Sequence, residues 1–251
     1  MTGLTTRYLG EVTRRLGELT ARAERGEWDA AARLMADAIV AGGVIQAFGT
    51  GHSEAFAMEL AGRAGGLIPT NKIALRDVVL FGGRDVDVLT GSSLERDPGT
   101  VDELIEVSPI GAHDVVVIAS NSGVNGSVVG LALKLKEAGH PVIAVTSLEH
   151  TSQVEPKHPS GKRLSEVADV VIDNLAPYGD AVLELREGVA VGAVSSITAA
   201  FIAQHLTMAV ADLLAADGSV PPLYISANIP GGDEHNTVLE DRYRDKIRRT
   251  A

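Results

Sequence analysis

Short apolar runs alternate with helical patterns along most of this chain, and this alternation constrains the fold more than any other feature. The four clearest runs, at residues 44–48, 114–119, 141–146 and 170–173, have the length and β-branched content of buried strands. Helical patterns at 53–64 and 126–138 follow two of them. Strands that alternate with helices form βαβ units, in which the strands are parallel and helices cover both faces of the sheet. We therefore expect an α/β fold, a three-layer αβα sandwich with a mainly parallel, flavodoxin-like sheet.

Helices are expected at both ends of the chain. Leu9, Val12, Leu16 and Leu19 recur at helical spacing, and a second helix is predicted at 28–41. Further predictions are a short strand at 78–81, a loop-like stretch at 148–166, a long helix at 195–216, an extended piece at 223–226 and a charged helix at 236–249. We expect a single domain over residues 1–251, with N-terminal helices at about 1–41 and a C-terminal helical tail at about 235–250.

Charge and composition exclude several functions. The formal net charge of −11 argues against binding nucleic acid or an anionic membrane, because the summed field repels phosphate. The chain has no cysteine, which removes disulfides, thiolate catalysis and cysteine-bound zinc and fits a reducing, cytoplasmic location. The polar N-terminus lacks the apolar core of a signal peptide. Gln204, His205 and Asp212 interrupt the most apolar segment, 189–216, so no membrane span is expected.

Small polar residues follow three of the predicted strands. The first turn reads "FGTGHS", the second "ASNSGVN", and the third is Thr146-Ser147. Parallel sheets bind ligands beyond the carboxyl ends of their strands, where glycine lets the backbone approach a ligand and helix N-termini offer free amides. The alternative is that each turn is only a capped strand-to-helix connection. The residues predicted to bind a small phosphorylated ligand are Gly51, His52, Ser53, Ser120, Asn121, Ser122, Gly123, Asn125 and Ser147.

These turns resemble those of the sugar isomerase (SIS) domain, a phosphosugar-binding fold, and the resemblance extends over about residues 34–214. In that family the second turn commonly reads Ser-x-Ser-Gly-x-Thr and holds the sugar phosphate; here Asn125 stands at its last position. The pattern "PPLYISANIPGGDEHN" at 221–236 is similar to that of a bacterial group of single-domain SIS proteins. Phosphoheptose isomerases and N-acetylmuramic acid 6-phosphate etherases are related branches. The resemblance implies a phosphosugar partner and assembly as a homodimer or larger homo-oligomer, in which a partner chain often completes the pocket.

The enzymes of this family need a base that removes a proton beside a carbonyl. "MELAGR" resembles the "ELTGR" segment of phosphoheptose isomerases, which implies that Glu59 is the base, although its spacing from the upstream serine is four residues shorter here. An ion pair between Glu59 and Arg63 is the alternative interpretation, and Glu54 is a rival base.

His235, just after the glycine pair of "IPGGDE", is the candidate second acid or base, acting in its own chain or in a partner. Its rival is His205, whose apolar helix equally suits a core histidine.

No cofactor and no metal site is expected, since His150, Glu155 and His158 lack a familiar ligand spacing. The absence of Gly-x-Ser-x-Gly argues against a serine hydrolase, and the absence of a Walker A sequence argues against a nucleotide kinase.

By analogy with the etherases we expect a lyase that dehydrates N-acetylglucosamine 6-phosphate or a similar amino-sugar 6-phosphate. An aldose–ketose isomerase is the second hypothesis, and a phosphosugar sensor without catalysis is the third.

Overall fold

A five-stranded parallel sheet forms the centre of the molecule. The structure is a computed structural model that describes residues 2–97, 99–216 and 218–249. The strands are β1 (Ile45–Gly49), β2 (Thr70–Ile73), β3 (Val115–Ala119), β4 (Val142–Thr146) and β5 (Val170–Asp173), in the spatial order β2-β1-β3-β4-β5. All four neighbouring pairs are parallel. This is the 2-1-3-4-5 order of flavodoxin-like folds, so the expected fold class is confirmed.

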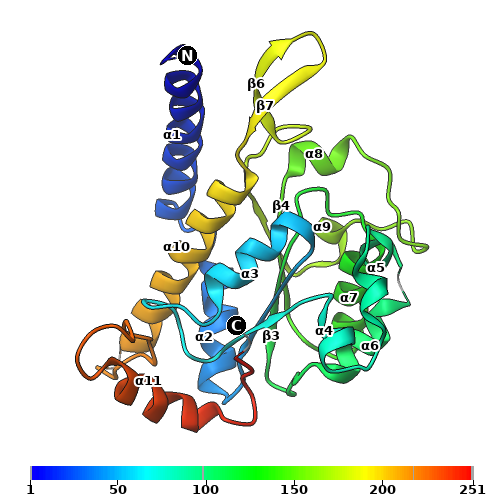
Figure 1. The fold of residues 1–251 in the computed structure, drawn as a ribbon. Helices are drawn as coiled ribbons and strands as arrows, with labels where there is room; N and C mark the ends of the chain where they lie inside the picture. The colour runs from blue at the N-terminus through cyan, green and yellow to red at the C-terminus, as the bar shows by residue number, and fades with distance from the viewer. Residues whose placement is uncertain (1, 98, 217, 250–251) are drawn as a thin grey trace.

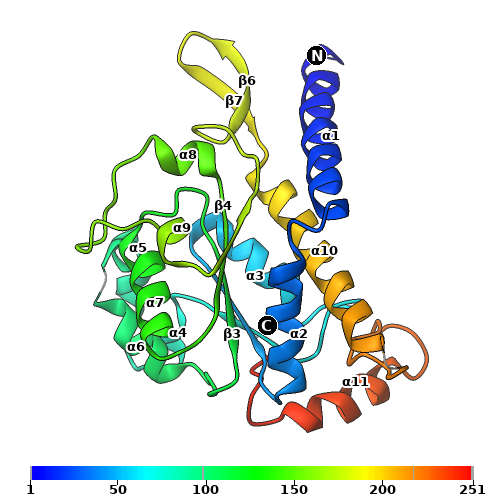
Figure 2. The ribbon, with the colours of Figure 1, turned by 180° about the vertical axis from the view of Figure 1, so that it is seen from behind.

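Helices cover both faces of this sheet and make the three layers visible in Figures 1 and 2. One face carries α2 (Asp29–Val40), α3 (Glu54–Leu60) and α10 (Ser195–Ala215). The other carries α4 (Asp77–Leu80), α5 (Ser93–Arg96), α6 (Thr100–Val107), α7 (Gly126–Glu137) and α9 (Leu164–Val167). Because side chains alternate along a strand, Val115 and Val117 pack into the first core, whereas Val116 and Ile118 pack into the second. Both cores are therefore built from Val, Ile, Leu and Ala with few aromatic residues.

Several predicted elements differ from those observed. Residues 78–81 were predicted as a strand but contribute to the short helix α4; the true strand, β2, was hidden by the polar side chains of Thr70, Asn71 and Lys72. Helix α3 ends at Leu60, four residues early, because Ala61 is extended. The loop-like stretch holds α8 (Leu148–Ser152) and α9. The tail was predicted as one helix at 236–249 but consists of α11 (Gly232–Glu240), η3 (Asp241–Tyr243) and non-helical residues up to Arg249.

Helix α1 (Thr2–Glu24) and the antiparallel hairpin of β6 (Ala181–Arg186) and β7 (Val189–Ala193) project together from the same end of the molecule, as both views show. The Tyr8 hydroxyl donates a 2.5 Å hydrogen bond to the carbonyl of Ala193. A Cβ on Gly192, whose φ is +85°, would lie 2.8 Å from the Tyr8 ring, so only glycine fits there. The sequence did not predict this hairpin.

The C-terminal residues cover the open edge of β2. Asn71 accepts a 2.6 Å hydrogen bond at its side-chain oxygen from the backbone N–H of Arg248. The Arg249 guanidinium donates to the carbonyls of Thr70 and Ile68, each at 2.7 Å. A covered edge strand cannot pair with another chain, so the tail protects this side of the sheet.

Among the described residues, one helix, α10, is long and apolar enough to cross a membrane by length and composition. In the structure α10 packs against α2 and α3, with Ile202, Leu206 and Val210 buried in the first core. Its apolar character is accounted for by this packing.

Candidate functional site

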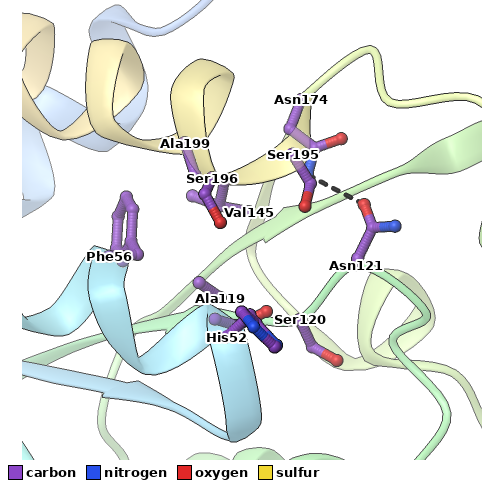
Figure 3. A pocket seen from close by; sticks show the side chains of 11 residues that line it. His52, Phe56, Ala119, Ser120, Asn121, Val145, Asn174, Ser195, Ser196 and Ala199 are labelled. Atoms are coloured by element: carbon purple, nitrogen blue, oxygen red, sulfur yellow. Dashed lines mark hydrogen bonds between the residues drawn. The ribbon is translucent and has the colours of Figure 1, made fainter. Parts of the chain in front are cut away.

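A pocket lies at the edge of the sheet where the strands end. It is lined by residues that follow β1, β3 and β5, together with the first turns of α10 and α3 (Figure 3). The space inside it that the centre of a water molecule can occupy is about 10 Å³. The lining side chains are His52, Ser53, Phe56, Ala119, Ser120, Asn121, Val145, Asn174, Ser195, Ser196 and Ala199. The pocket includes the position between β1 and β3 where the strand order reverses, which is the usual ligand position in such sheets.

The turn after β1 presents two polar side chains to the pocket. The chain passes through the 3₁₀ turn η1 (Gly51–Ser53), in which Gly51 has a φ of +54°. A side chain at Gly49 would overlap the backbone carbonyl of Ser53, so this turn requires glycine there. Both His52 and Ser53 border the pocket, and among the described contacts neither side chain is engaged in a hydrogen bond. Both are therefore available to a ligand.

The turn after β3 supplies the opposite wall. Ser120 is buried, and its Oγ accepts a 3.1 Å hydrogen bond from the backbone N–H of Gly123, which leaves the hydroxyl proton to donate. The Asn121 side-chain oxygen accepts a 3.2 Å hydrogen bond from the Asn174 amide across the sheet edge, drawn as a dashed line in Figure 3. Gly123 has a φ of +63° and lies against Thr146 and Thr151, so a side chain at this position would be strained.

Three predicted residues of this second turn lie outside the pocket lining. Ser122 and Gly123 are adjacent to it in sequence. Asn125 precedes α7 without capping it, and its side-chain NH2 group donates a hydrogen bond to the carboxylate of Glu95. Its Oδ1 atom is buried without a hydrogen-bond partner in the described structure.

Ser147 is not brought to the pocket. Its hydroxyl donates a 2.6 Å hydrogen bond to the carbonyl of Ala176 and accepts a 2.9 Å bond from the backbone N–H of His150. The side chain is fully buried and caps the N-terminus of α8. Ser147 therefore stabilises the start of α8 and the chain at Ala176 and does not face the pocket.

Sequence reasoning missed three polar residues of the pocket. Ser195 and Ser196 begin the long helix α10, and Asn174 follows β5. Asn174 is nearly fully buried, and its side-chain oxygen accepts a 3.0 Å hydrogen bond from the backbone N–H of Ala176. An Asn directly after an apolar run was the available signal for this residue, whereas the two serines are far from the other turns in sequence.

Glu59 lies one helical turn beyond the pocket residue Phe56 and is not part of the lining. Its Oε1 atom accepts a 2.6 Å hydrogen bond from the side-chain amide of Gln204 on α10. Arg63 forms an ion pair with the same oxygen. The ion pair considered from the sequence is thus present, joined by a contact with α10 that the sequence did not indicate.

The rival carboxylate Glu54 is held by two cations. Arg76 Nη2 lies 2.6 Å and Lys72 Nζ lies 3.5 Å from its Oε1 atom. These side chains belong to the far side of α3 from Glu59, and none of them lines the pocket.

The two candidate histidines are also away from the pocket of their own chain. His235 lies in the first turn of α11, where its Nε2 atom is 3.0 Å from the carbonyl of Leu223. His205 packs edge-to-face on Trp28, with ring centroids 4.9 Å apart. Burial lowers the pKa of His205 below its usual value, as expected for a core histidine.

The pocket is lined by uncharged polar and apolar side chains together with the imidazole of His52. Among the described residues that line it, none is Asp, Glu, Lys or Arg. Within residues 2–97, 99–216 and 218–249, no group of three or more His, Cys, Asp or Glu side chains is placed to hold a metal ion. Hydroxyls, side-chain amides and main-chain N–H groups are therefore what this site offers to a ligand.

The fold is similar to that of solved sugar-phosphate isomerases. A phosphoheptose isomerase from Francisella tularensis superposes with a TM-score of 0.53 at 18% identity, over 84% of this chain and 98% of that one. A phosphoheptose isomerase from Neisseria gonorrhoeae gives a TM-score of 0.52 at 20% identity, over 86% and 98% of the two chains. The molecule thus has the fold of the SIS-type sugar-phosphate isomerases.

Sequence comparison narrows this class to a family. The SIS domain family matches residues 7–147, beginning earlier and ending earlier than the resemblance seen in the sequence. A UPF0309 protein of Listeria monocytogenes, lmo0025, is 39% identical over 86% of this chain and 88% of its own length. A UPF0309 protein of Brucella canis, BCAN_B0929, is 38% identical over 98% of both chains. The chain belongs to the SIS domain family, and its relatives are single-domain UPF0309 proteins.

Proposed function

We propose that this protein is a cytoplasmic phosphosugar-processing enzyme that holds a sugar phosphate between the turns after β1 and β3. The single observation that carries the proposal is the meeting of Ser53, Ser120 and Asn121 at one sheet edge around a pocket. Uncharged hydroxyls and main-chain amides at strand ends bind phosphoryl groups without a lysine clamp. The phosphoheptose isomerases with the same fold act on substrates of this class, as their names state, which supports the same ligand here.

The reaction begins with removal of the C2 proton of the open-chain sugar. In the proposal Glu59 takes this proton and the aldehyde oxygen receives the charge as an enolate. For N-acetylglucosamine 6-phosphate, return of that electron pair expels the C3 hydroxyl, which leaves as water once His235 has protonated it. The products are water and an unsaturated aldehyde phosphate, so the protein acts as a dehydratase.

An aldose–ketose isomerase is the second candidate, and the names of the structural neighbours favour it. It uses the same C2 proton abstraction and the same phosphate site. The two reactions diverge afterwards, since isomerisation returns the proton to C1 and keeps the C3 hydroxyl in place. Observing the product therefore distinguishes them.

The catalytic residues reach the pocket only if two copies of the chain share a site. The described lining contains no carboxylate, and Glu59 lies outside it with Gln204 on an exposed face of α3 and α10. That face also exposes Met58, Ile197 and Met208, which are 56%, 38% and 61% exposed. We propose that a second copy covers these apolar side chains and that Glu59 and His235 act on a pocket of the assembled homodimer.

The test is incubation of the protein with a panel of aldose and amino-sugar 6-phosphates in deuterated water, followed by proton NMR. Loss of the C2 proton signal together with loss of water supports the dehydratase, because its unsaturated product carries no hydrogen at C2, and a ketose product supports the isomerase. Binding without loss of the C2 proton signal for any sugar of the panel would identify a sensor and overturn the enzymatic proposal.

A further inference from the structure

A partly buried carboxylate, that of Asp180, accepts hydrogen bonds at the N-terminus of α10 beside the pocket. The Oδ1 atom of Asp180 accepts hydrogen bonds from the backbone N–H groups of Val194 and Ser195, at 3.1 and 2.8 Å. Its Oδ2 atom accepts a 2.7 Å hydrogen bond from the hydroxyl of Ser195. Ser195 lines the pocket, so the negative charge of Asp180 lies one residue behind the pocket wall.

Holding Asp180 in this position requires an unfavourable backbone conformation. Its φ is +69°, in the left-handed region that non-glycine residues seldom adopt. The three hydrogen bonds to the start of α10 hold it there, since such strain persists only where the surroundings fix it. The residue is therefore placed by its contact with α10 and not by the preference of its own backbone.

The N-terminus of α7, on the other side of the pocket, differs from that of α10 in its side-chain contacts. Helix α7 begins directly after the turn that holds Ser120, and its N-cap residue Asn125 makes no side-chain hydrogen bond to it. No acidic residue lies in the first turn of α7. The Glu95 carboxylate lies beside this helix end through its contact with Asn125, but among the described contacts it accepts no hydrogen bond from the first backbone N–H groups of α7, whereas Asp180 accepts two at the start of α10.

We propose that Asp180 determines specificity by keeping a second anionic group out of the α10 end of the pocket. This inference rests on the proposed function, in which the phosphoryl group lies at the turn of Ser120. A sugar monophosphate then places its uncharged end against Ser195 and Ser196, where a carboxylate or a second phosphate would meet the charge of Asp180. The preferred substrates are accordingly monophosphates whose other end is neutral.

The hydroxyl of Ser196 is consistent with an uncharged group of the substrate at the α10 end of the pocket. Ser195 gives its hydroxyl proton to Asp180, whereas the Ser196 side chain has no hydrogen bond among the described contacts. Figure 3 shows the Ser196 hydroxyl directed toward the space between Phe56 and Ala119. A neutral hydroxyl donor and acceptor suits a sugar hydroxyl or amide, so it complements the uncharged end of such a substrate.

The experiment compares glucose 6-phosphate with glucose 1,6-bisphosphate as ligands, by calorimetry on the full chain and on the variant Asp180→Asn. Asn tolerates a positive φ and can cap a helix, so the fold is retained while the charge is removed. We expect the bisphosphate to bind weakly to the wild type and about fivefold or more tightly to the variant, with the affinity for the monophosphate changed little. The matched control is Asp233→Asn, which removes a carboxylate from the first turn of another helix, α11.

The possible results distinguish a failure of the proposed function from a failure of the role assigned to Asp180. If the wild type binds neither of these two ligands nor any other sugar phosphate of the panel, the proposed function is wrong. If it binds the monophosphate but the ratio of the two affinities is the same in Asp180→Asn as in the wild type, the role of Asp180 is wrong and the proposed function stands. Asp180→Gly, which keeps the backbone conformation and lacks the carboxylate, must raise the affinity for the bisphosphate as well; failure to do so also overturns the role of Asp180.

Discussion

The side-chain amide of Gln204 donates a 2.6 Å hydrogen bond to the carboxylate of Glu59, joining α10 to α3 across 145 residues of sequence. Arg63 reaches the same carboxylate oxygen from the residues just past the end of α3. Both partners use Oε1, so among the described contacts Oε2 is left to accept a proton. Gln204 thus acts as a positioning residue for the proposed base.

Replacing Gln204 by Leu removes this orienting hydrogen bond. We expect the rate of C2 deuterium exchange to fall by about ten- to a hundredfold, because a carboxylate that is no longer held in place abstracts the proton more slowly by about this factor. The Kd for the sugar phosphate should be unchanged. Glu59→Gln should abolish exchange and keep binding. The control is Gln153→Leu, at an exposed glutamine outside α10. An unchanged exchange rate in Glu59→Gln would refute the assignment of the base.

Ser120 and Ser147 follow neighbouring strands and should behave in opposite ways when changed to Ala. Ser120→Ala removes the hydroxyl of a side chain that lines the pocket, so the affinity for a sugar phosphate should drop about tenfold or more, as for a hydrogen bond to a charged group. Ser147→Ala leaves buried partners unsatisfied at Ala176 and His150 and should lower the free energy of unfolding by about 1–3 kcal/mol, with affinity retained. Titration calorimetry and urea unfolding measure the two effects, and the reverse pattern would contradict the site.

The strands that the sequence predicted are those whose side chains are apolar on both faces. β3 and β4 are runs of this kind, because two helical layers bury them, and β1 and β5 are apolar apart from Gln46 and Asp173. β2 is an edge strand with polar residues whose partners come from the distant C-terminus, as the contacts of Asn71 with Arg248 show. No local pattern could reveal that contact.

The hairpin could have been found. A run that contains Glu184 and Arg186, at 181–186, and an apolar run, at 189–193, are separated by Glu187 and Gly188, and Gly188 adopts a φ of +73°, a turn conformation that favours glycine. The prediction missed it because residues 189–193 were taken together with the apolar helix that follows. Strand β7 is short and ends at Ala193, two residues before α10 begins at Ser195.

The site was predictable as an edge of the sheet but not as a set of side chains. Parallel strands bring Ser53, Ser120 and Asn121 to one edge, and this part of the site follows from topology alone. The direction of a side chain does not follow from topology. Ser147 is turned inward, whereas Ser196, in the first turn of α10, borders the pocket from a distant part of the sequence. Such placement depends on tertiary packing.

If the exposed face of α10 forms the dimer contact, a charged side chain introduced there should weaken the dimer. Met208→Glu places a carboxylate among apolar side chains and should convert the dimer into a monomer, because an unpaired charge is costly in an interface. Light scattering with size-exclusion chromatography measures the mass, and deuterium exchange at C2 should be lost together with the dimer. Val238→Glu, at a 60% exposed position on α11, is the control. A dimer that persists in Met208→Glu shows that this face is not the contact.

Gly232, the second glycine of the "IPGG" segment, lies where no side chain fits, and we expect its replacement to destabilise the protein. A Cβ at Gly232 would overlap the carbonyl of Ser226, so Gly232→Ala forces the chain before α11 to move. We expect a loss of about 2 kcal/mol or more in the free energy of unfolding, as for overpacked sites. Gly17→Ala, in the open middle of α1, should instead stabilise by about 0.5–1 kcal/mol, because it restricts the unfolded chain and meets no atom. Urea unfolding of both variants checks the contrast, which would fail if the two changed stability in the same direction.

The contact between His205 and Trp28 predicts a pH-dependent fluorescence signal. Trp28 is the single tryptophan of the chain, and its ring meets the His205 ring with centroids 4.9 Å apart. Burial lowers the pKa of His205 below 6.5, although the nearby Asp29 partly opposes this. The folded state therefore binds fewer protons than the unfolded state between that lowered pKa and 6.5, so stability decreases as the pH falls through this window and is fully present above it. We expect tryptophan fluorescence to be quenched on acidification with a midpoint below pH 6.5, and His205→Gln to abolish the transition and flatten the dependence of urea unfolding on pH. A midpoint at or above 6.5, or one that survives in His205→Gln, would show that this histidine is not the buried, neutral partner of Trp28.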